Sequence, residues 1–443
     1  MAVGCLALLP AVTRPGHAVT DAGAPFDPVT ASSPAPAGPA ARGSVGRVGV
    51  ATAAIAVCGY AVLYLAARDL EPAGFSLFAV FWGAFGLVSG ATGGLLQEAT
   101  REVRSAAHVE VTEGPRSRPM WVGALVGVVS AAAIALSSPL WSEYVFVESR
   151  WLSVTLLSVG LAGFCLHSTL LGISAGLDRW TAYGSQMVTD ASLRLLVAVA
   201  TFLVGWGLAG YLWATVAGSV AWLIMLIVSS ATRRAAGLST PVGTADFLRG
   251  ASHSITAAGA SAILVMGFPV LLQATSDDLG AVGGIVILAV TLTRAPLLVP
   301  LTAMQGNLVA HFVDQRTHRL RALVAPTVIV TGVGLLGVLV AWAAGPWLLR
   351  SAFGAEYRAD GALLAWLTGG AIAVSLLTLT GAAAVAAALH RAYSLGWVSA
   401  TVASTLLLLL PLDLQTRTVV ALVCGPVVGI AVHLFALSRR RAA

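Results

Sequence analysis

The chain has 443 residues, of which 58% are hydrophobic and 10% are charged, and its mean hydropathy is +0.88. Soluble domains carry about a quarter charged residues, so this composition excludes a soluble enzyme, a secreted disulfide-rich protein and a nucleic-acid-binding domain. All 25 basic residues are arginines against 19 acidic residues, and the sequence predicts an integral membrane protein in which the positions of the arginines matter more than the net charge of +6.

The N-terminal segment, residues 1–45, is rich in Ala, Pro, Gly and Ser. Such a composition buries too little apolar surface to offset the entropy of ordering, so we expect a disordered cytoplasmic tail. A signal peptide and a misassigned start codon are both open explanations of the MAVGCLALLP start, and the absence of basic residues there argues against the signal peptide.

Twelve apolar stretches follow, each compared with the roughly 20 helical residues that cross about 30 Å of hydrocarbon. The predicted spans are 48–67, 72–96, 119–141, 151–177, a fifth that includes Asp190 and Arg194, a sixth ending near Ser230, 250–276, 279–304, 322–349, 361–389, 392–412 and 418–438. The fifth and sixth come from 38 uncharged residues between Arg194 and Arg233, which as one helix would extend about 57 Å. The glycine-rich Gly205–Gly210 is the expected turn between them.

Arginines in the predicted loops give an orientation. With twelve spans, eighteen arginines fall on the side of the termini and five on the opposite side. Because short cytoplasmic loops are enriched in basic residues, both termini are expected in the cytoplasm, in a bacterial inner membrane.

An internal repeat is indicated by two similar helix ends. Leu177-Asp-Arg-Trp-Thr-Ala-Tyr183 and Leu389-His-Arg-Ala-Tyr393 share a Leu and an Arg at an offset of 212 residues, and the same offset superimposes the predicted halves. Six spans per half give both halves the same orientation, as in transporters with parallel repeats. The predicted fold is an all-α polytopic membrane protein of two six-helix lobes, residues 46–235 and 236–438, with a basic C-terminal end at 439–443. The alternative to an internal repeat is a chance match of a short motif.

Three segments then suggest a family. Leu70–Phe78 resembles the "GxxxYGxxxL" opening of the second helix in polysaccharide and oligosaccharide-lipid flippases of the multidrug/oligosaccharidyl-lipid/polysaccharide (MOP) exporter superfamily. Leu171–Arg179 with Tyr183 is similar to that family's "QGxxRxxxY" turn, and Leu292–Pro300 is similar to its eighth-helix "RxPxxL" segment. The motifs are degenerate, and the resemblance rests on their order and spacing over about residues 45 to 440.

The resemblance implies movement of an undecaprenyl-diphosphate-linked saccharide to the outer leaflet by alternating access of two lobes, for cell-surface polysaccharide biosynthesis. Expected partners are that lipid-linked saccharide, membrane lipids and polysaccharide polymerases or transferases, with no nucleic acid. The predicted first span has no carboxylate, whereas multidrug extruders of the superfamily commonly use an acidic residue in the N-terminal lobe. A multidrug or cation exporter of the same fold nevertheless stays open.

Arg294 is the leading candidate for substrate binding. A charge inside a span costs about 2.5 to 3.5 kcal/mol, so it is by default a functional hypothesis. Its planar guanidinium suits a diphosphate, and Pro296 and Pro300 are expected to kink the helix there. The alternative is a structural Arg that binds carbonyls freed by the prolines or extends to the membrane interface.

Asp190 and Arg194 lie four residues apart and therefore on one face of the fifth helix, which favours a mutually neutralised pair. The functional alternative is that the pair opens during transport, so that Asp190 takes a coupling H⁺ or Na⁺ and Arg194 meets the lipid phosphate.

Enzymatic activity is not expected. The sequence has no Lys, no Walker A loop, no HExxH motif and no CxxC spacing among Cys5, Cys58, Cys165 and Cys424, so neither a metal nor another cofactor is predicted. A membrane-embedded glycosyltransferase, ligase or polymerase is disfavoured by the short loops opposite the termini, and a scaffold protein by the lack of a soluble domain.

Overall fold

The computed structural model describes residues 39–106, 116–304, 308, 311–312, 315, 319–387 and 389–439. The chain divides into a unit of Met1–Arg42 and a unit of Gly43–Ala443, and every contact given below lies in the second unit. Most of the predicted tail, residues 1–38, and residues 440–443 of the predicted basic end lie outside the described residues. Helix begins at Pro39, ahead of the predicted boundary at residue 45.

The described residues are almost entirely helical, because apolar chain in a bilayer must satisfy its backbone hydrogen bonds internally. The first half contains α1 (Pro39–Asp69), α2 (Glu71–Ala91), α3 (Gly93–Ala106), α4 (Pro119–Val145), α5 (Arg150–Gly176), α6 (Trp180–Val204), α7 (Gly207–Ala217), the 3-10 turn η1 (Gly218–Val220), α8 (Ala221–Val228) and α9 (Ser230–Ala236). The second half contains α10 (Thr244–Val265), α11 (Phe268–Ala274), α12 (Gly280–Ala303), α14 (Arg319–Ala322), α15 (Val324–Phe353), α16 (Gly361–Ala386), α17 (His390–Leu408) and α18 (Leu414–Arg439).

Ten helices in the described part of the chain are long and apolar enough to cross a membrane, and the bent pair α10–α11 makes an eleventh if it is one span. The eleventh predicted span, 392–412, corresponds to α17, which has 19 residues and is not among these. Each of the twelve predicted stretches thus coincides with a helix or with a series of consecutive helices. The turn predicted at Gly205 is confirmed, since this glycine ends α6 with a φ of 73° that favours glycine.

Among the described residues, one predicted span is sharply bent. The seventh, 250–276, breaks after Val265, and α10 and α11 meet at an angle of 67°. Pro269, in the first turn of α11, has no N–H to donate back into α10, and Gly267 precedes it without a side chain. By contrast, α12 continues through Pro296 and Pro300, where the sequence predicted a kink. The break lies instead between α10 and α11, next to α12.

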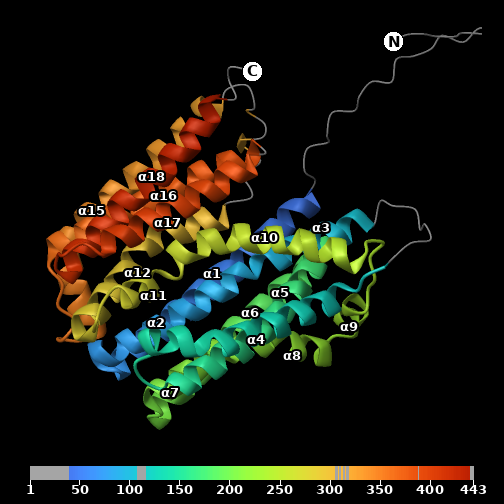
Figure 1. The fold of residues 1–443 in the computed structure, drawn as a ribbon, viewed down its shortest axis with the longest axis horizontal. Coiled ribbons are helices and arrows are strands. Elements are labelled where there is room, and N and C mark those ends of the chain that lie inside the picture. The colour runs from blue at the N-terminus through green and yellow to red at the C-terminus, as the bar shows by residue number, and fades with distance from the viewer. Residues whose placement is uncertain are drawn as a thin grey trace, which may run out of the picture. The chain divides into compact units, whose positions relative to one another are not determined.

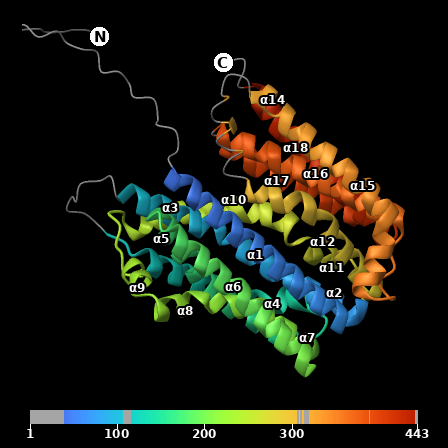
Figure 2. The ribbon, with the colours of Figure 1, turned by 180° about the vertical axis from the view of Figure 1, so that it is seen from behind.

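The helices form two lobes, α1–α9 and α10–α18, that are seen from opposite sides in Figures 1 and 2. Within the first lobe α5 packs on α3 and α4, and α6 packs on α7; within the second, α16 packs on α12, α15 and α18. The lobes meet where α2 contacts α10, α11 and α12, and where α3 contacts α10.

The repeat is visible in the order of the helices. Ala91 ends α2 and Ala303 ends α12, which is the predicted offset of 212, and α5 corresponds in the same way to α16 within two residues at each end. Both halves therefore run in the same direction.

We call the side on which α1 ends and α18 begins the far side, and the side on which α18 ends the terminal side. On the far side the lobes are joined by aromatic residues. The Tyr357 hydroxyl donates to the Ala67 carbonyl at 2.9 Å, and the rings of Tyr64 and Phe353 lie 5.7 Å apart. Burial raises the pKa of Tyr357, so the hydroxyl keeps the proton that it donates.

Candidate functional site

Arg294 of α12 is buried, with 7% of its surface exposed. Its Nη1 donates to the carbonyls of Leu264 and Val265 at 3.5 and 3.3 Å, and its Cζ lies 5.2 Å from the ring centre of Phe268. Within the described residues, Nε and Nη2 have no hydrogen-bond partner. A guanidinium carries five N–H donors, so most of the hydrogen-bonding capacity of this one is unused.

The carbonyls that Arg294 contacts belong to the last residues of α10, where the helix breaks before α11. The sequence analysis offered a structural role as the alternative, in which Arg294 binds carbonyls freed by Pro296 and Pro300. Arg294 does bind backbone carbonyls, but these belong to a neighbouring broken helix. The two hydrogen bonds are long for N–H···O bonds, and in the part of the chain that the structure describes no carboxylate pairs with the charge. Such a site is strongly electropositive.

This break lies directly against the first lobe. A Cβ on Gly83 of α2 would lie 3.1 Å from the Met266 carbonyl oxygen, and one on Gly86 would lie 3.2 Å from the Met266 Cβ. A rotation of one lobe against the other must therefore move the residues that cover Arg294.

Asp190 and Arg194 form the pair that their spacing predicts. Arg194 Nε and Nη2 donate to Asp190 Oδ1 at 3.0 and 2.9 Å, and Nη1 donates to the Thr215 carbonyl at 2.5 Å. Both side chains are 14% exposed. Gly218 is packed so closely that a Cβ there would contact Asp190 Oδ1.

Aromatic rings and a histidine surround this pair. The Arg194 Cζ lies 5.2 and 5.7 Å from the ring centres of Phe85 and Phe164, positions that suit cation–π attraction. One helical turn away, the Gln186 amide lies 3.2 Å from His167 Nδ1 and donates to the His167 carbonyl. This is the hydrogen-bonded packing role that is ordinary for a lone histidine on an apolar helix.

The structure does not bring the three predicted residues together. Asp190 and Arg194 share one cluster in the first lobe, whereas Arg294 lies in the second lobe beside α10 and α11. A single lipid diphosphate cannot be assigned to both arginines from these contacts.

Asp69 is a candidate that the sequence analysis missed. Its Oδ2 is buried at the end of α1 beside the Tyr211 hydroxyl of α7, a group that can donate to it. The predicted first span ended at residue 67, two residues short of this carboxylate. Allowing the helix to continue to Asp69, where it does end, would have included this residue.

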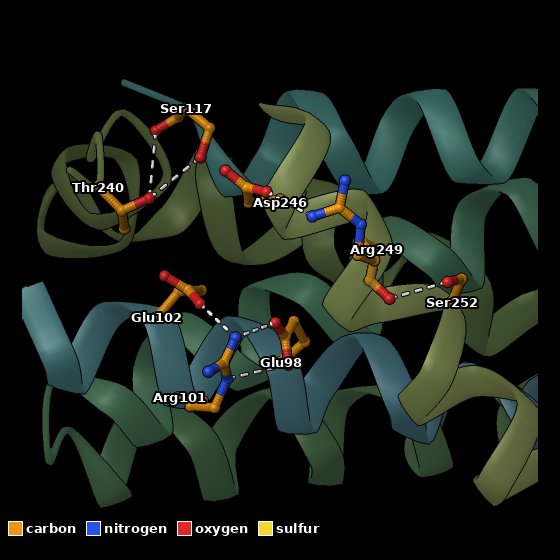
Figure 3. Close-up of polar contacts among 8 residues, drawn as sticks. All are labelled: Glu98, Arg101, Glu102, Ser117, Thr240, Asp246, Arg249 and Ser252. Carbon is orange, nitrogen blue, oxygen red and sulfur yellow. Dashed lines mark hydrogen bonds and ion pairs between the residues drawn. The ribbon is translucent and has the colours of Figure 1, made fainter. Parts of the chain in front are cut away.

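A polar cluster on the terminal side joins the halves of the chain (Figure 3). Arg101 of α3 lies between two carboxylates, with Nη2 at 2.5 Å from Glu98 Oε1 and 2.6 Å from Glu102 Oε1. A Cβ on Gly250 of α10 would contact Glu98, so the two helices touch at this point. The linker before α10 is fixed by paired backbone hydrogen bonds of 3.1 and 2.8 Å between Ser117 and Thr240. We interpret this cluster as a joint between helices.

No group of three or more His, Cys, Asp or Glu side chains in the described ranges is placed to hold a metal ion. Cys58, Cys165 and Cys424 are free.

Comparison with known proteins gives close relatives in mycobacteria. The uncharacterized protein Rv3630 of Mycobacterium tuberculosis is 68% identical over 423 residues, covering 95% of this chain and 98% of the relative. The uncharacterized protein Rv1510 of the same organism is 68% identical over 406 residues, covering 92% of this chain and 94% of the relative. The chain matches no family model.

Solved structures with a similar fold are transporters. An inward-facing multidrug resistance MATE family transporter of the MOP superfamily has a TM-score of 0.64 at 14% identity, over 88% of this chain and 98% of that one. An outward-facing structure of such a transporter has a TM-score of 0.60 at 14% identity, over 90% and 95%. A MOP superfamily transporter from Pyrococcus furiosus, described as having a binding pocket of reversed polarity that suggests a different function, has a TM-score of 0.58 at 13% identity, over 89% and 95%.

Proposed function

The chain belongs to the same family as the mycobacterial proteins Rv3630 and Rv1510 and has the fold of MOP superfamily transporters. On this premise we propose that it moves an undecaprenyl-diphosphate-linked saccharide from the cytoplasmic to the outer leaflet. The lobes would expose the substrate site alternately to the two sides. The saccharide would then pass to polymerases or transferases of the cell envelope.

The observation that carries this proposal is the state of Arg294. Among the described residues its charge has no carboxylate partner, and two of its nitrogens have unused N–H groups at the junction of the lobes. Buried donors without partners are costly, so a ligand that supplies anionic oxygens would be bound strongly there. A diphosphate supplies such oxygens, whereas a cationic drug would be repelled.

A multidrug or cation exporter is the second candidate, and Asp69 is the observation in its favour. Asp69 has no ion-pair partner among the described residues, so its carboxylate could attract a cation, in contrast to Asp190, whose charge Arg194 neutralises. The fold does not decide between the two, since even the Pyrococcus furiosus neighbour is described as differing in pocket polarity and function.

The proposed membrane is the bacterial inner membrane, with the terminal side in the cytoplasm. The distribution of arginines supports this orientation, because eighteen of them fall on the terminal side of the twelve-span arrangement. The membrane potential could then drive export, since moving one charge across 100 mV is worth about 2.3 kcal/mol. A diphosphate of charge about minus two leaving a negative-inside cell would gain about 4 to 5 kcal/mol.

Asp190 and Arg194 have a proposed secondary role. In the described conformation each satisfies the other, so neither is free for an ion or for phosphate. The coupling role of Asp190 and the substrate role of Arg194 therefore both require the pair to separate in another arrangement of the lobes.

The test is to measure transbilayer movement of a fluorescent undecaprenyl-diphosphate saccharide in liposomes with Arg294→Ala and Arg294→Lys. We expect a loss of about 100-fold for the Ala variant and a smaller loss for Lys, which keeps the charge but not the planar fork. Arg350→Ala is the matched control, because the side chain of this exposed arginine on the far side donates, within the described ranges, to a carbonyl of its own helix alone. Unchanged movement in a folded Arg294→Ala protein would remove the basis of the proposal.

A further inference from the structure

Two carboxylates of α3 share one arginine where α3 packs on α10 (Figure 3). Arg101 donates to Glu98 from Nη2 at 2.5 Å and from Nε at 3.1 Å, and the same Nη2 donates to Glu102 Oε1 at 2.6 Å. The two glutamate side chains are each 5% exposed, whereas the Arg101 side chain is 62% exposed. With all three groups ionised, this terminal-side joint therefore carries one surplus negative charge, and that charge is buried.

The second oxygen of Glu102 is the unsatisfied atom of the joint. Oε2 is buried and has no hydrogen-bond partner within the described residues, and in Figure 3 it points away from Arg101. The nearby carboxylate of Asp246 on α10 acts on Glu102 electrostatically, although Arg249 pairs with Asp246 at 2.9 Å. A carboxylate that is buried beside other carboxylates and lacks a donor is unfavourable as an anion.

The other charged groups around α3 do not compensate Glu102. On the side of α5, Arg104 pairs with Asp178, and these side chains are 53% and 65% exposed. On α10, His253 is exposed and makes no ion pair in the described ranges. Nor do the described residues place three such ligands around a metal ion. A proton is the cation that fits, because it removes the surplus charge and turns Oε2 into a hydrogen-bond donor.

The burial of both glutamates depends on α10. A Cβ on Gly250 of α10 would contact the Glu98 carboxylate, and a Cβ on Gly94 of α3 would contact the backbone of Ile255. The two helices therefore approach each other at backbone distance. Because α3 belongs to the first lobe and α10 to the second, separation of the lobes on the terminal side would admit water to Glu98 and Glu102. Water stabilises the charged form of a carboxylate.

We propose that Glu102 binds a proton while the joint is closed and releases it to water on the terminal side when α3 and α10 separate. In the release, the O–H bond of the carboxylic acid breaks, the proton passes to water, and the carboxylate stays beside Arg101. The inference rests on the lobe movement of the proposed function and deepens it by adding regulation. The closed joint holds the proton more tightly, so low pH on the terminal side favours closure and higher pH favours opening.

The test uses spin labels at Ser105→Cys on α3 and Ala245→Cys on α10, two exposed positions, in full-length protein without native cysteines. Distances are measured in phosphatidylcholine nanodiscs without saccharide. We expect one short distance at about pH 5, and a fall of about tenfold in the ratio of short to long distances by about pH 9. Distances that do not change with pH in this protein would overturn the inference.

Glu102→Gln carries no charge at any pH and should keep the short distance throughout. Asp178→Asn is the matched control, since Asp178 is also a terminal-side carboxylate paired with an arginine but is 65% exposed, and it should follow the wild type. A wild-type pH response in Glu102→Gln would overturn the inference.

Arg101→Gln gives a second measurement that does not depend on the folding of Glu102→Gln. Loss of the positive charge should make Glu102 hold its proton more firmly and move the opening to higher pH. Opening at lower pH would overturn the inference. Saccharide movement by a protein whose distances ignore pH would refute the proton site and leave the proposed function. A pH response without saccharide movement would refute the proposed function and leave the proton site.

Discussion

Arg194 and Arg294 show two uses of the same side chain inside a membrane. Arg194 is bound by a carboxylate, a carbonyl and two aromatic rings, so its charge is satisfied where it lies. Arg294 has one ring and two long contacts to carbonyls. Since the cost of burying a charge falls with each good partner, Arg294 has more to gain from a ligand.

Asp190→Asn tests whether the pair in the first lobe is structural. Removing the carboxylate leaves Arg194 buried with fewer partners, and we expect the free energy of unfolding to fall by about 3 kcal/mol. Thermal unfolding in detergent would show it. The double variant Asp190→Asn/Arg194→Gln should recover part of the loss, and if it also transports at the wild-type rate, then neither residue couples or binds the substrate.

Gly218→Ala tests how tightly this pair is packed. A Cβ there would contact Asp190 Oδ1, so we expect a loss of about 1 to 3 kcal/mol from overpacking. Gly369→Ala in α16 is the control, because a Cβ at Gly369 meets nothing within 4 Å and alanine favours a helix by about 1 kcal/mol. Equal unfolding temperatures for the two variants would contradict the packing described.

A side-chain contact could be predicted from the sequence where its two residues are close together in the chain. The Asp190–Arg194 pair follows from helical spacing alone, and the structure confirms it. The partners of Arg294 come from α10, which is distant in sequence, so hydropathy and motifs could place the arginine in a span but could not identify what it touches. Asp69 was missed because the end of an apolar stretch is a poor guide to the end of a helix.

At the scale of elements, the break between α10 and α11 is the feature that connects the site to the lobes. A hydropathy profile shows one continuous apolar stretch there, because a bend in the helix does not change the amino-acid composition. The Gly267–Pro269 segment carries the local signal, whereas Pro296 and Pro300, which looked stronger, lie in a helix that continues. Neighbouring helices can compensate for a proline in a membrane, so its presence alone does not predict a kink.

The far-side contact between α1 and the loop before α16 has its own test. Tyr357→Phe removes the hydroxyl that donates to the Ala67 carbonyl, a loss of about 1 kcal/mol that should shift the equilibrium between lobe arrangements about fivefold. Spin labels at Arg68→Cys and Ser351→Cys, in a background without native cysteines, should show a larger population of long distances. Tyr144→Phe, at a tyrosine that is 71% exposed, is the control and should leave the distances unchanged.

At the scale of the whole molecule, composition and hydropathy predict the two-lobed helical fold well. The spans, the Gly205 turn and the offset of the halves are all properties that each segment carries in its own sequence. The pairing of α3 with α10 and of α2 with α12 depends on close approach of small residues from distant segments. No signal in one sequence reports such pairing, which is why the lobe interface could not be predicted.

The proposed orientation predicts the outcome of reporter fusions. A green fluorescent protein fused after Arg439 should fluoresce, because the terminal side is proposed to be cytoplasmic. Alkaline phosphatase fused after Trp206, between α6 and α7 on the far side, should be active outside the membrane. The opposite pattern would show that the arginine distribution misassigns the orientation.

The central claim concerns the substrate, and leaflet-selective quenching tests it most directly. Wild-type protein in liposomes with an imposed membrane potential would be given a fluorescent undecaprenyl-diphosphate saccharide and, separately, a cationic dye. The account predicts that the lipid moves between leaflets faster than in protein-free liposomes, that Arg294→Ala abolishes this movement, and that the dye is retained. Efflux of the dye without movement of the lipid would contradict the account and identify a cation exporter.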